Sequence, residues 1–221
     1  MKKIFSPSHT AIFVLVVFVM FFLATTVSAK DWYELQDLSD TQLTEQILKF
    51  QEELSQSSSN YEMLKAIGIA YHIKAAKDTE AYAPKAVEFL SKACEMDKKD
   101  YETICYLGSA TTMMATTTWN PIKKMSYVNK GAALMDKAIR KAPDNVSVRM
   151  TRAFNSKNLP PFLNRGDIAL EDFEYLADLI EKNPESLTSI KKTVYVNLVE
   201  LYSKAGDEVK AEKFRKMAGS L

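Results

Sequence analysis

The spacing of the apolar residues constrains the fold more than any other feature of the chain. Apolar side chains recur at intervals of three and four along almost every segment. This is the period of one face of an α-helix. We find no convincing alternating run rich in β-branched residues, which a strand would require. The pattern therefore predicts an all-α chain, divided by turn residues at 97–100, 143–144 and 183–184.

Capping signals indicate where the helices begin. The capping box Ser39–Gln42 predicts a first helix that ends in the polar stretch 55–59, and a second box, Ser59–Glu62, begins the next helix. Pro84 at a first helical position is expected to open the partner of that helix after a loop. Further helices are expected over 101–118, 121–142, 145–157, 167–182 and 189–204, with a last one after the turn at 205–207.

Paired helices that repeat at intervals of thirty to fifty residues are typical of an α-solenoid. The first and last pairs combine large residues and an aromatic residue on one helix with small residues on the other. In the first pair these are Leu64, Ile67, Gly68, Tyr71, Ala86, Leu90 and Ala93; in the last they are Tyr195, Leu198, Val199, Tyr202, Ala211 and Ala218.

With these residues, the chain resembles the tetratricopeptide repeat (TPR) family, and in particular exported bacterial-type members. The resemblance implies a repeat domain of about four helix pairs over 60–221, preceded by an extra N-terminal helix and linker at 30–59. The central repeats are degenerate. Thr111 replaces the aromatic residue of the second pair, and Arg149 and Arg152 occupy positions of the third pair where large apolar residues are usual.

The N-terminal residues have the layout of a secretory signal peptide. Lys2 and Lys3 precede an apolar run, and Val27–Ala29 supplies the small residues that signal peptidase recognises. We therefore expect cleavage after Ala29, removal of residues 1–29, and a periplasmic or otherwise exported protein. The alternative is an uncleaved anchor, because residues 11–29 are just long enough to span a bilayer. The chain would contact a membrane only in that case.

The charge balance limits which partners the chain can bind, and its two cysteines limit it to one internal disulfide. The 29 basic and 28 acidic side chains nearly balance, so the chain has no excess of positive charge to attract nucleic acid or an anionic membrane. The only cysteines are Cys94 and Cys105. An oxidising compartment permits a disulfide between them, and the alternative is that they are two small buried residues.

The sequence indicates no catalytic site, metal site or cofactor. Beyond the predicted signal peptide the only histidine is His72, without a cluster of cysteines or histidines at zinc spacing. Phosphate-binding glycine loops and nucleophile-elbow motifs are absent from the sequence. The carboxylates Glu171, Asp172 and Glu174 are interpreted as a solvated helix face.

Two surfaces are candidates for partner binding. The segments 116–121 and 158–166 both connect the two helices of a pair, and such connections emerge along one edge of a solenoid. The predicted anchors at this edge are Trp119, Phe162, Leu163, Asn164 and Arg165. The alternative is that Trp119 and Phe162 fold back and cap the long central hairpin.

The second surface is a groove that the family resemblance implies along the first helices of the pairs. Its expected lining residues are Lys65, His72, Thr112, Arg149, Arg152 and Asn155. An acidic peptide would suit the two arginines, which could equally pair with carboxylates of the next helix.

These patterns favour a non-catalytic adaptor that binds a protein or peptide partner in the cell envelope. One alternative is a solute-binding accessory component of a transport system, which an aromatic cavity around Trp119, Tyr127 and Phe162 would favour. A second alternative is an unrecognised enzyme that uses His72. Self-association through the last helix would make the chain a homo-oligomer.

Overall fold

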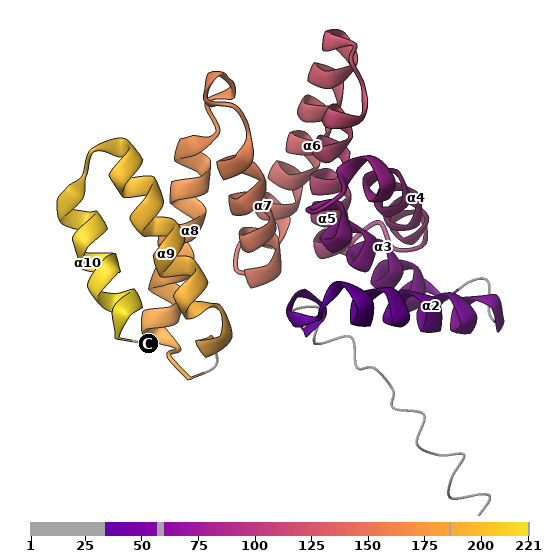
Figure 1. The fold of residues 1–221 in the computed structure, drawn as a ribbon, viewed down its shortest axis with the longest axis horizontal. Helices are drawn as coiled ribbons and strands as arrows, with labels where there is room; N and C mark the ends of the chain where they lie inside the picture. Colours follow the sequence, from indigo (N-terminus) through magenta and orange to yellow (C-terminus); the bar gives the residue numbers. More distant parts are fainter. Residues whose placement is uncertain (1–33, 57–59, 186, 221) are drawn as a thin grey trace, which may run out of the picture. The chain divides into compact units, whose positions relative to one another are not determined.

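The computed structural model describes residues 34–56, 60–185 and 187–220. Residues 33–221 form one compact unit, and its described part is helical with no strand (Figure 1). The all-α prediction is therefore confirmed for this part. The predicted signal peptide and the end of the linker, residues 57–59, lie outside the described residues. In the described part, no helix has the length and apolar character to cross a membrane.

The elements follow one another with short connections. The α-helices are α2 (Asp40–Gln56), α3 (Tyr61–Ala75), α4 (Thr79–Met96), α5 (Tyr101–Met113), α6 (Pro121–Lys141), α7 (Val146–Asn158), α8 (Gly166–Lys182), α9 (Thr188–Ala205) and α10 (Glu208–Gly219). Within the described residues, three short 3-10 helices accompany them: η1 (Glu34–Asp37), η2 (Met114–Thr117) and η3 (Pro161–Leu163).

Side-chain caps start several helices where the sequence predicts them. At α2 the Gln42 amide donates to Ser39 Oγ at 3.3 Å, and the Ser39 amide donates to Gln42 Oε1 at 3.0 Å. This reciprocal pair is the predicted capping box. At α3 the cap is Asn60, one residue after the predicted cap Ser59, which lies outside the described residues; the Asn60 side chain accepts from the Met63 amide at 3.2 Å.

The prediction that Pro84 opens a helix is wrong. The helix α4 already begins at Thr79, because the Asp78 side chain accepts from the Ala81 amide at 3.0 Å and caps it there. Pro84 therefore lies inside α4. It lies beyond the first turn, because the Tyr82 amide already bonds to the Asp78 carbonyl oxygen at 3.2 Å, so its missing N–H removes one hydrogen bond from the helix.

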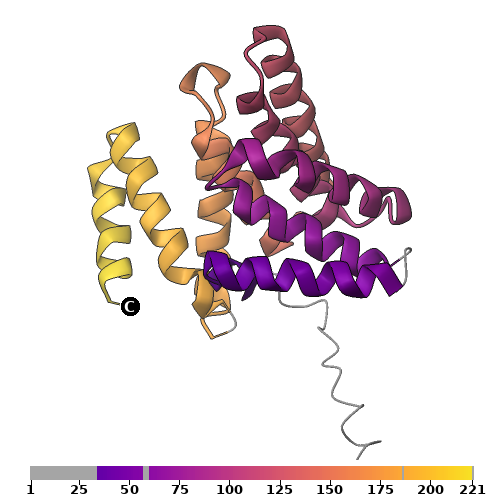
Figure 2. The same ribbon diagram turned by 45° about the vertical axis from the view of Figure 1, so that its right-hand side comes forward.

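The helices pack in consecutive pairs, α3 with α4, α5 with α6, α7 with α8 and α9 with α10. The first helices of neighbouring pairs also meet, because α3 contacts α5 and α5 contacts α7. Figures 1 and 2 show these pairs following one another within the unit. Three helices that are separated along the sequence are thereby brought onto one face.

Two glycines allow the helices of the long α5–α6 pair to approach each other closely. A Cβ atom on Gly131 would lie 2.3 Å from the Gly108 carbonyl oxygen, and one on Gly108 would lie 2.7 Å from the Gly131 carbonyl oxygen. These distances leave no space for a side chain at either position. The two helix backbones are therefore in direct contact at this crossing.

A buried ion pair joins α7 to α8. Asp172 is 0 % exposed, and its Oδ1 accepts from Arg149 Nη1 and Arg152 Nη2, both at 2.8 Å, while its Oδ2 accepts from Arg152 Nε at 2.7 Å. The interpretation of Asp172 as part of a solvated face is therefore wrong. The two arginines can occupy apolar positions of the repeat pattern because Asp172, together with Asp136 and Glu171 nearby, balances their charge.

Candidate functional site

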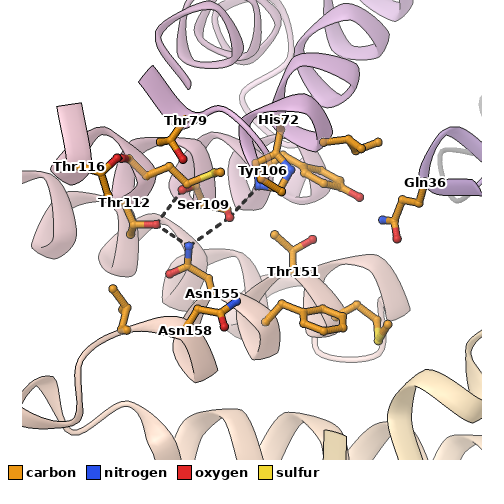
Figure 3. A pocket seen from close by; sticks show the side chains of 16 residues that line it. Gln36, His72, Thr79, Tyr106, Ser109, Thr112, Thr116, Thr151, Asn155 and Asn158 are labelled. Atoms are coloured by element: carbon orange, nitrogen blue, oxygen red, sulfur yellow. Dashed lines mark hydrogen bonds between the residues drawn. The ribbon is translucent and has the colours of Figure 1, made fainter. Parts of the chain in front are cut away.

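A pocket of about 520 Å³ lies on the face formed by α3, α5 and α7 (Figure 3). Its polar side comes from His72 on α3, Ser109 and Thr112 on α5, and Thr151 and Asn155 on α7. Apolar lining residues complete the wall: Ile73, Met113, Met150, Phe154 and Leu159. The pocket thus combines a hydrogen-bonding side with an apolar side, as ligand pockets commonly do.

A hydrogen-bond network connects the three helices at this pocket. The Asn155 amide nitrogen Nδ2 donates to Ser109 Oγ at 3.1 Å and makes a second, short bond to Thr112 Oγ1. Ser109 Oγ is also 2.8 Å from His72 Nε2, and Thr112 Oγ1 donates to the Ser109 carbonyl oxygen at 2.7 Å. The network fixes the polar groups before any ligand arrives.

His72 is neutral at this site. Burial lowers its pKa to about 4, and its ring packs edge-on against Tyr106 with 5.2 Å between the ring centroids. Its Nδ1 atom and the Asn155 Oδ1 atom are buried without a hydrogen-bond partner in the described part of the chain. Buried polar atoms are rarely left unsatisfied, so the two atoms mark this network as unusual.

The side chains that line the pocket are all uncharged. The expected groove residues Lys65, Arg149 and Arg152 are not among them. Lys65 Nζ lies 2.7 Å from both Asp100 Oδ2 and Glu102 Oε2, and the two arginines bind Asp172. Their charge is neutralised within the fold, so the pocket lacks the cations on which the expectation of an acidic peptide depended.

The structure brings together three of the six predicted groove residues, His72, Thr112 and Asn155. The family-based interpretation missed Ser109 and Thr151. A polar stripe at helical spacing was the available signal, because Ser109 and Thr112 are three apart, as are Asn155 and Asn158.

At the predicted edge, Trp119 is 95 % exposed and Phe162 is 72 % exposed. They do not fold back, so the capping alternative is wrong: each lies at the end of a helix pair, beyond the reach of the core. Asn164 is exposed in the left-handed conformation, with φ 53°, and Leu163 is half-buried. Arg165 donates to Asp136 at 2.8 and 2.9 Å, so its charge is engaged within the fold.

Cys94 and Cys105 are free thiols, so the disulfide alternative is not realised in the structure. Cys105 is buried, and its thiol donates to the Val148 carbonyl oxygen at 3.5 Å. Burial raises the pKa of the half-buried Cys94 thiol to about 12 and that of Cys105 further. Both side chains therefore act as small, unreactive packing residues.

No protein-family model matches the chain, and no curated protein matches it in sequence. The resemblance to the TPR family therefore depends on the residues quoted above and stays a prediction. In the described segments, no three His, Cys, Asp or Glu side chains gather as metal ligands. With its hydrogen-bond network and its apolar wall, the pocket on α3, α5 and α7 is the candidate functional site in this part of the chain.

Proposed function

We propose that the protein is a non-catalytic, exported adaptor of TPR type that holds an uncharged segment of a protein partner in the cell envelope. The observation that carries this proposal is the pocket itself. Hydrogen-bonding groups from three helices face a space of about 520 Å³ whose lining contains no charged side chain.

The helix arrangement supports the solenoid part of the proposal. In a solenoid each repeat contacts its neighbours, and the first helices of the repeats line a common concave face. The contacts from α3 to α5 and from α5 to α7 fit this arrangement, and the pocket lies on these three helices. The small residues of the repeat pattern, among them Gly68 and Ala93, are buried between helices as that pattern requires.

The chemistry of the pocket indicates which partner segments fit. A charged side chain would lose its hydration without gaining a counterion, which makes its burial costly. An amide or hydroxyl side chain can bond to the network of Ser109, Thr112 and Asn155, and an apolar neighbour can pack on Phe154 and Met150. Because the network is preformed, binding requires little ordering of the protein side.

A small neutral solute is the second candidate ligand, because the volume of the pocket falls within the range of small-molecule sites. This is the solute-binding alternative at a new position, since the pocket is not lined by Trp119, Tyr127 or Phe162. A catalytic role for His72 is not favoured. A general base near neutral pH needs a pKa near 7, whereas burial lowers that of His72 to about 4.

Peptide display against the intact chain, followed by calorimetry, tests the proposal. We expect the selected peptides to carry uncharged side chains at their centre and to lose at least about tenfold in affinity for Asn155→Leu, which removes two hydrogen bonds of the network. Asn197→Leu on α9 is the matched control, because Asn197 is buried and hydrogen-bonded but lies outside the pocket.

The contradicting outcome is equal affinity for Asn155→Leu and the wild type, with Asn197→Leu also unchanged. A screen of neutral solutes by thermal shift separates the second candidate. The pocket would be assigned to solute binding by two results together. A neutral solute would raise the melting temperature of the wild type but not of Asn155→Leu, and peptide display would select no peptide.

A further inference from the structure

The α5–α6 pair ends in a tip, residues 118–125, that exposes several large apolar side chains. Trp119 is 95 % exposed, Ile122 is 80 % exposed and Met125 is 41 % exposed. Ile122 and Met125 lie three apart on α6 and therefore on one side of it. Single exposed apolar residues are ordinary, but a group within a few residues marks an interaction surface. The tip thus has a role that the pocket does not explain.

The charge near this tip is of one sign. From 103 to 135 the sequence contains no Asp or Glu, and its charged residues are Lys123, Lys124 and Lys130. None of these lysines forms an ion pair with a residue that the structure describes. Lys124 Nζ lies 5.7 Å from the centre of the Trp119 ring, so cation and aromatic ring lie together at the tip.

One other connection differs from the tip in composition, and another resembles it. The turn between α4 and α5, residues 97–100, carries two lysines but also two aspartates. The connection between α7 and α8 contains the exposed Phe162 and no acidic residue. In both views, this connection and the tip point toward the same edge of the unit (Figures 1 and 2). The edge therefore presents apolar rings and positive charge together.

We propose that the tip docks on an anionic lipid surface, with Trp119 and Ile122 in the headgroup region and Lys123 and Lys124 beside anionic headgroups. Tryptophan is enriched at membrane interfaces, and lysines near such a surface are attracted to acidic lipids. A protein interface is the less fitting occupant, because the buried centres of protein interfaces are depleted in lysine. The proposal revises the expectation that the chain contacts a membrane only through an uncleaved anchor, because the chain is nearly neutral as a whole but its residues 103–135 carry lysines and no acidic residue. The surface is separate from the pocket, and this inference does not depend on the proposed function.

Fluorescence of Trp119 tests the proposal directly. The chain has two tryptophans, so Trp32→Phe leaves Trp119 as the only one in the full-length protein. The probes are vesicles of phosphatidylcholine with and without phosphatidylglycerol, each also prepared with brominated acyl chains. We expect Trp119 emission to shift to shorter wavelength and to be quenched by the brominated lipid, much more strongly when phosphatidylglycerol is present. The readout is local, so binding of residues 1–29 to vesicles cannot by itself produce it.

A charge reversal with a matched control completes the test. Lys123→Glu with Lys124→Glu should weaken the anionic-vesicle response at least about tenfold, because each lysine near the surface contributes on the order of 1 kcal/mol. Lys98→Glu with Lys99→Glu makes the same change in net charge at exposed positions at the other end of α5, and should stay within about twofold of the parent.

Three results with vesicles would overturn the proposal. They are an unshifted, unquenched Trp119 on anionic vesicles, equal responses with and without phosphatidylglycerol, and equal losses in the two charge-reversed variants. Shielding of Trp119 by a protein partner, without any response to vesicles, would assign the tip to protein recognition and would equally overturn it.

Discussion

The middle of the described chain and its C-terminal pair are both made of antiparallel helices, but different interactions hold them. Between α5 and α6 two glycines bring the backbones into contact, and between α7 and α8 a buried carboxylate binds two arginines. Between α9 and α10 the contacts are aromatic: the rings of Tyr202 and Phe214 stack with 5.9 Å between centroids.

This difference shows how one helical pattern can serve two purposes. Aromatic packing fills the space between α9 and α10, and the Tyr202 hydroxyl donates to Glu174 on α8. The glycine contact between α5 and α6 and the buried ion pair between α7 and α8 keep these helices packed together. Their other faces can therefore carry the polar groups of the pocket. We infer that the middle of the chain is built for recognition and that the C-terminal pair is built for stability.

The largest expected effect is at the α7–α8 junction. Asp172→Asn keeps the shape of the side chain but leaves two buried arginines short of a counterion, and breaking such a pair costs about 3–5 kcal/mol. We expect the free energy of unfolding, measured with urea, to fall by that amount. Glu171→Gln is the control, since Glu171 is largely exposed and should cost less than about 1 kcal/mol. Similar small losses in both variants would contradict this account.

A comparable loss of stability is expected from Phe214→Ala, but with a different consequence for binding. Removing the buried ring, which packs on Tyr195 and Tyr202, should lower the free energy of unfolding by about 3–5 kcal/mol. Pocket ligands should bind unchanged below the melting transition, as calorimetry can determine. A parallel loss of affinity would show that the two regions are not separable.

The glycine crossing provides a test within the middle region. Gly131→Ala places a Cβ atom against the Gly108 carbonyl oxygen, which cannot rotate away, so we expect a loss of about 1–3 kcal/mol or more in urea unfolding. Gly166→Ala is the control, because nothing lies within 4 Å of its added Cβ atom. The close-contact argument fails if Gly131→Ala unfolds at the same urea concentration as the parent.

The pH dependence of stability tests whether the half-buried His72 is neutral in the folded chain. Burial lowers its pKa to about 4 in the folded chain, while in the unfolded chain it stays near 6.5. Between these values the unfolded state binds more protons, so stability falls as the pH falls from 6.5 toward 4, by on the order of 1 kcal/mol per unit. His72→Asn should remove this part of the slope in urea titrations at several pH values. An unchanged slope would mean that the His72 ring is not buried as described.

The smallest expected effect is at the hairpin tip. Trp119→Ala removes an exposed ring and should change the free energy of unfolding by less than about 0.5 kcal/mol. The same substitution should abolish the contribution of the ring to vesicle binding. A marked loss of stability in urea would instead indicate that the ring packs on the fold.

Local rules predicted the helices well and the site only in part. The caps at Ser39 and Asn145 and the break at Gly206 follow from neighbouring residues, so the sequence indicates them directly. The position of Pro84 was misinterpreted because the cap at Asp78 competes with it for the helix start.

The remaining differences depend on distant partners. Asp172 resembles a surface carboxylate until α8 is packed on α7, where two arginines about twenty residues earlier reach it. The pocket likewise forms only when α3, α5 and α7 are brought together, and helical periodicity does not specify that packing. The polar stripe on α5 shows which face of that helix lines the pocket, but it does not identify the other helices that line it.

Photocrosslinking in the cells that make the protein tests the central claim most directly. A photoreactive amino acid would replace Asn158, an exposed residue at the pocket, or Val196, which is 49 % exposed on α9. If recognition belongs to the middle of the chain, position 158 forms a defined adduct that disappears with Asn155→Leu, and position 196 forms none. An adduct from position 196 alone would contradict the account.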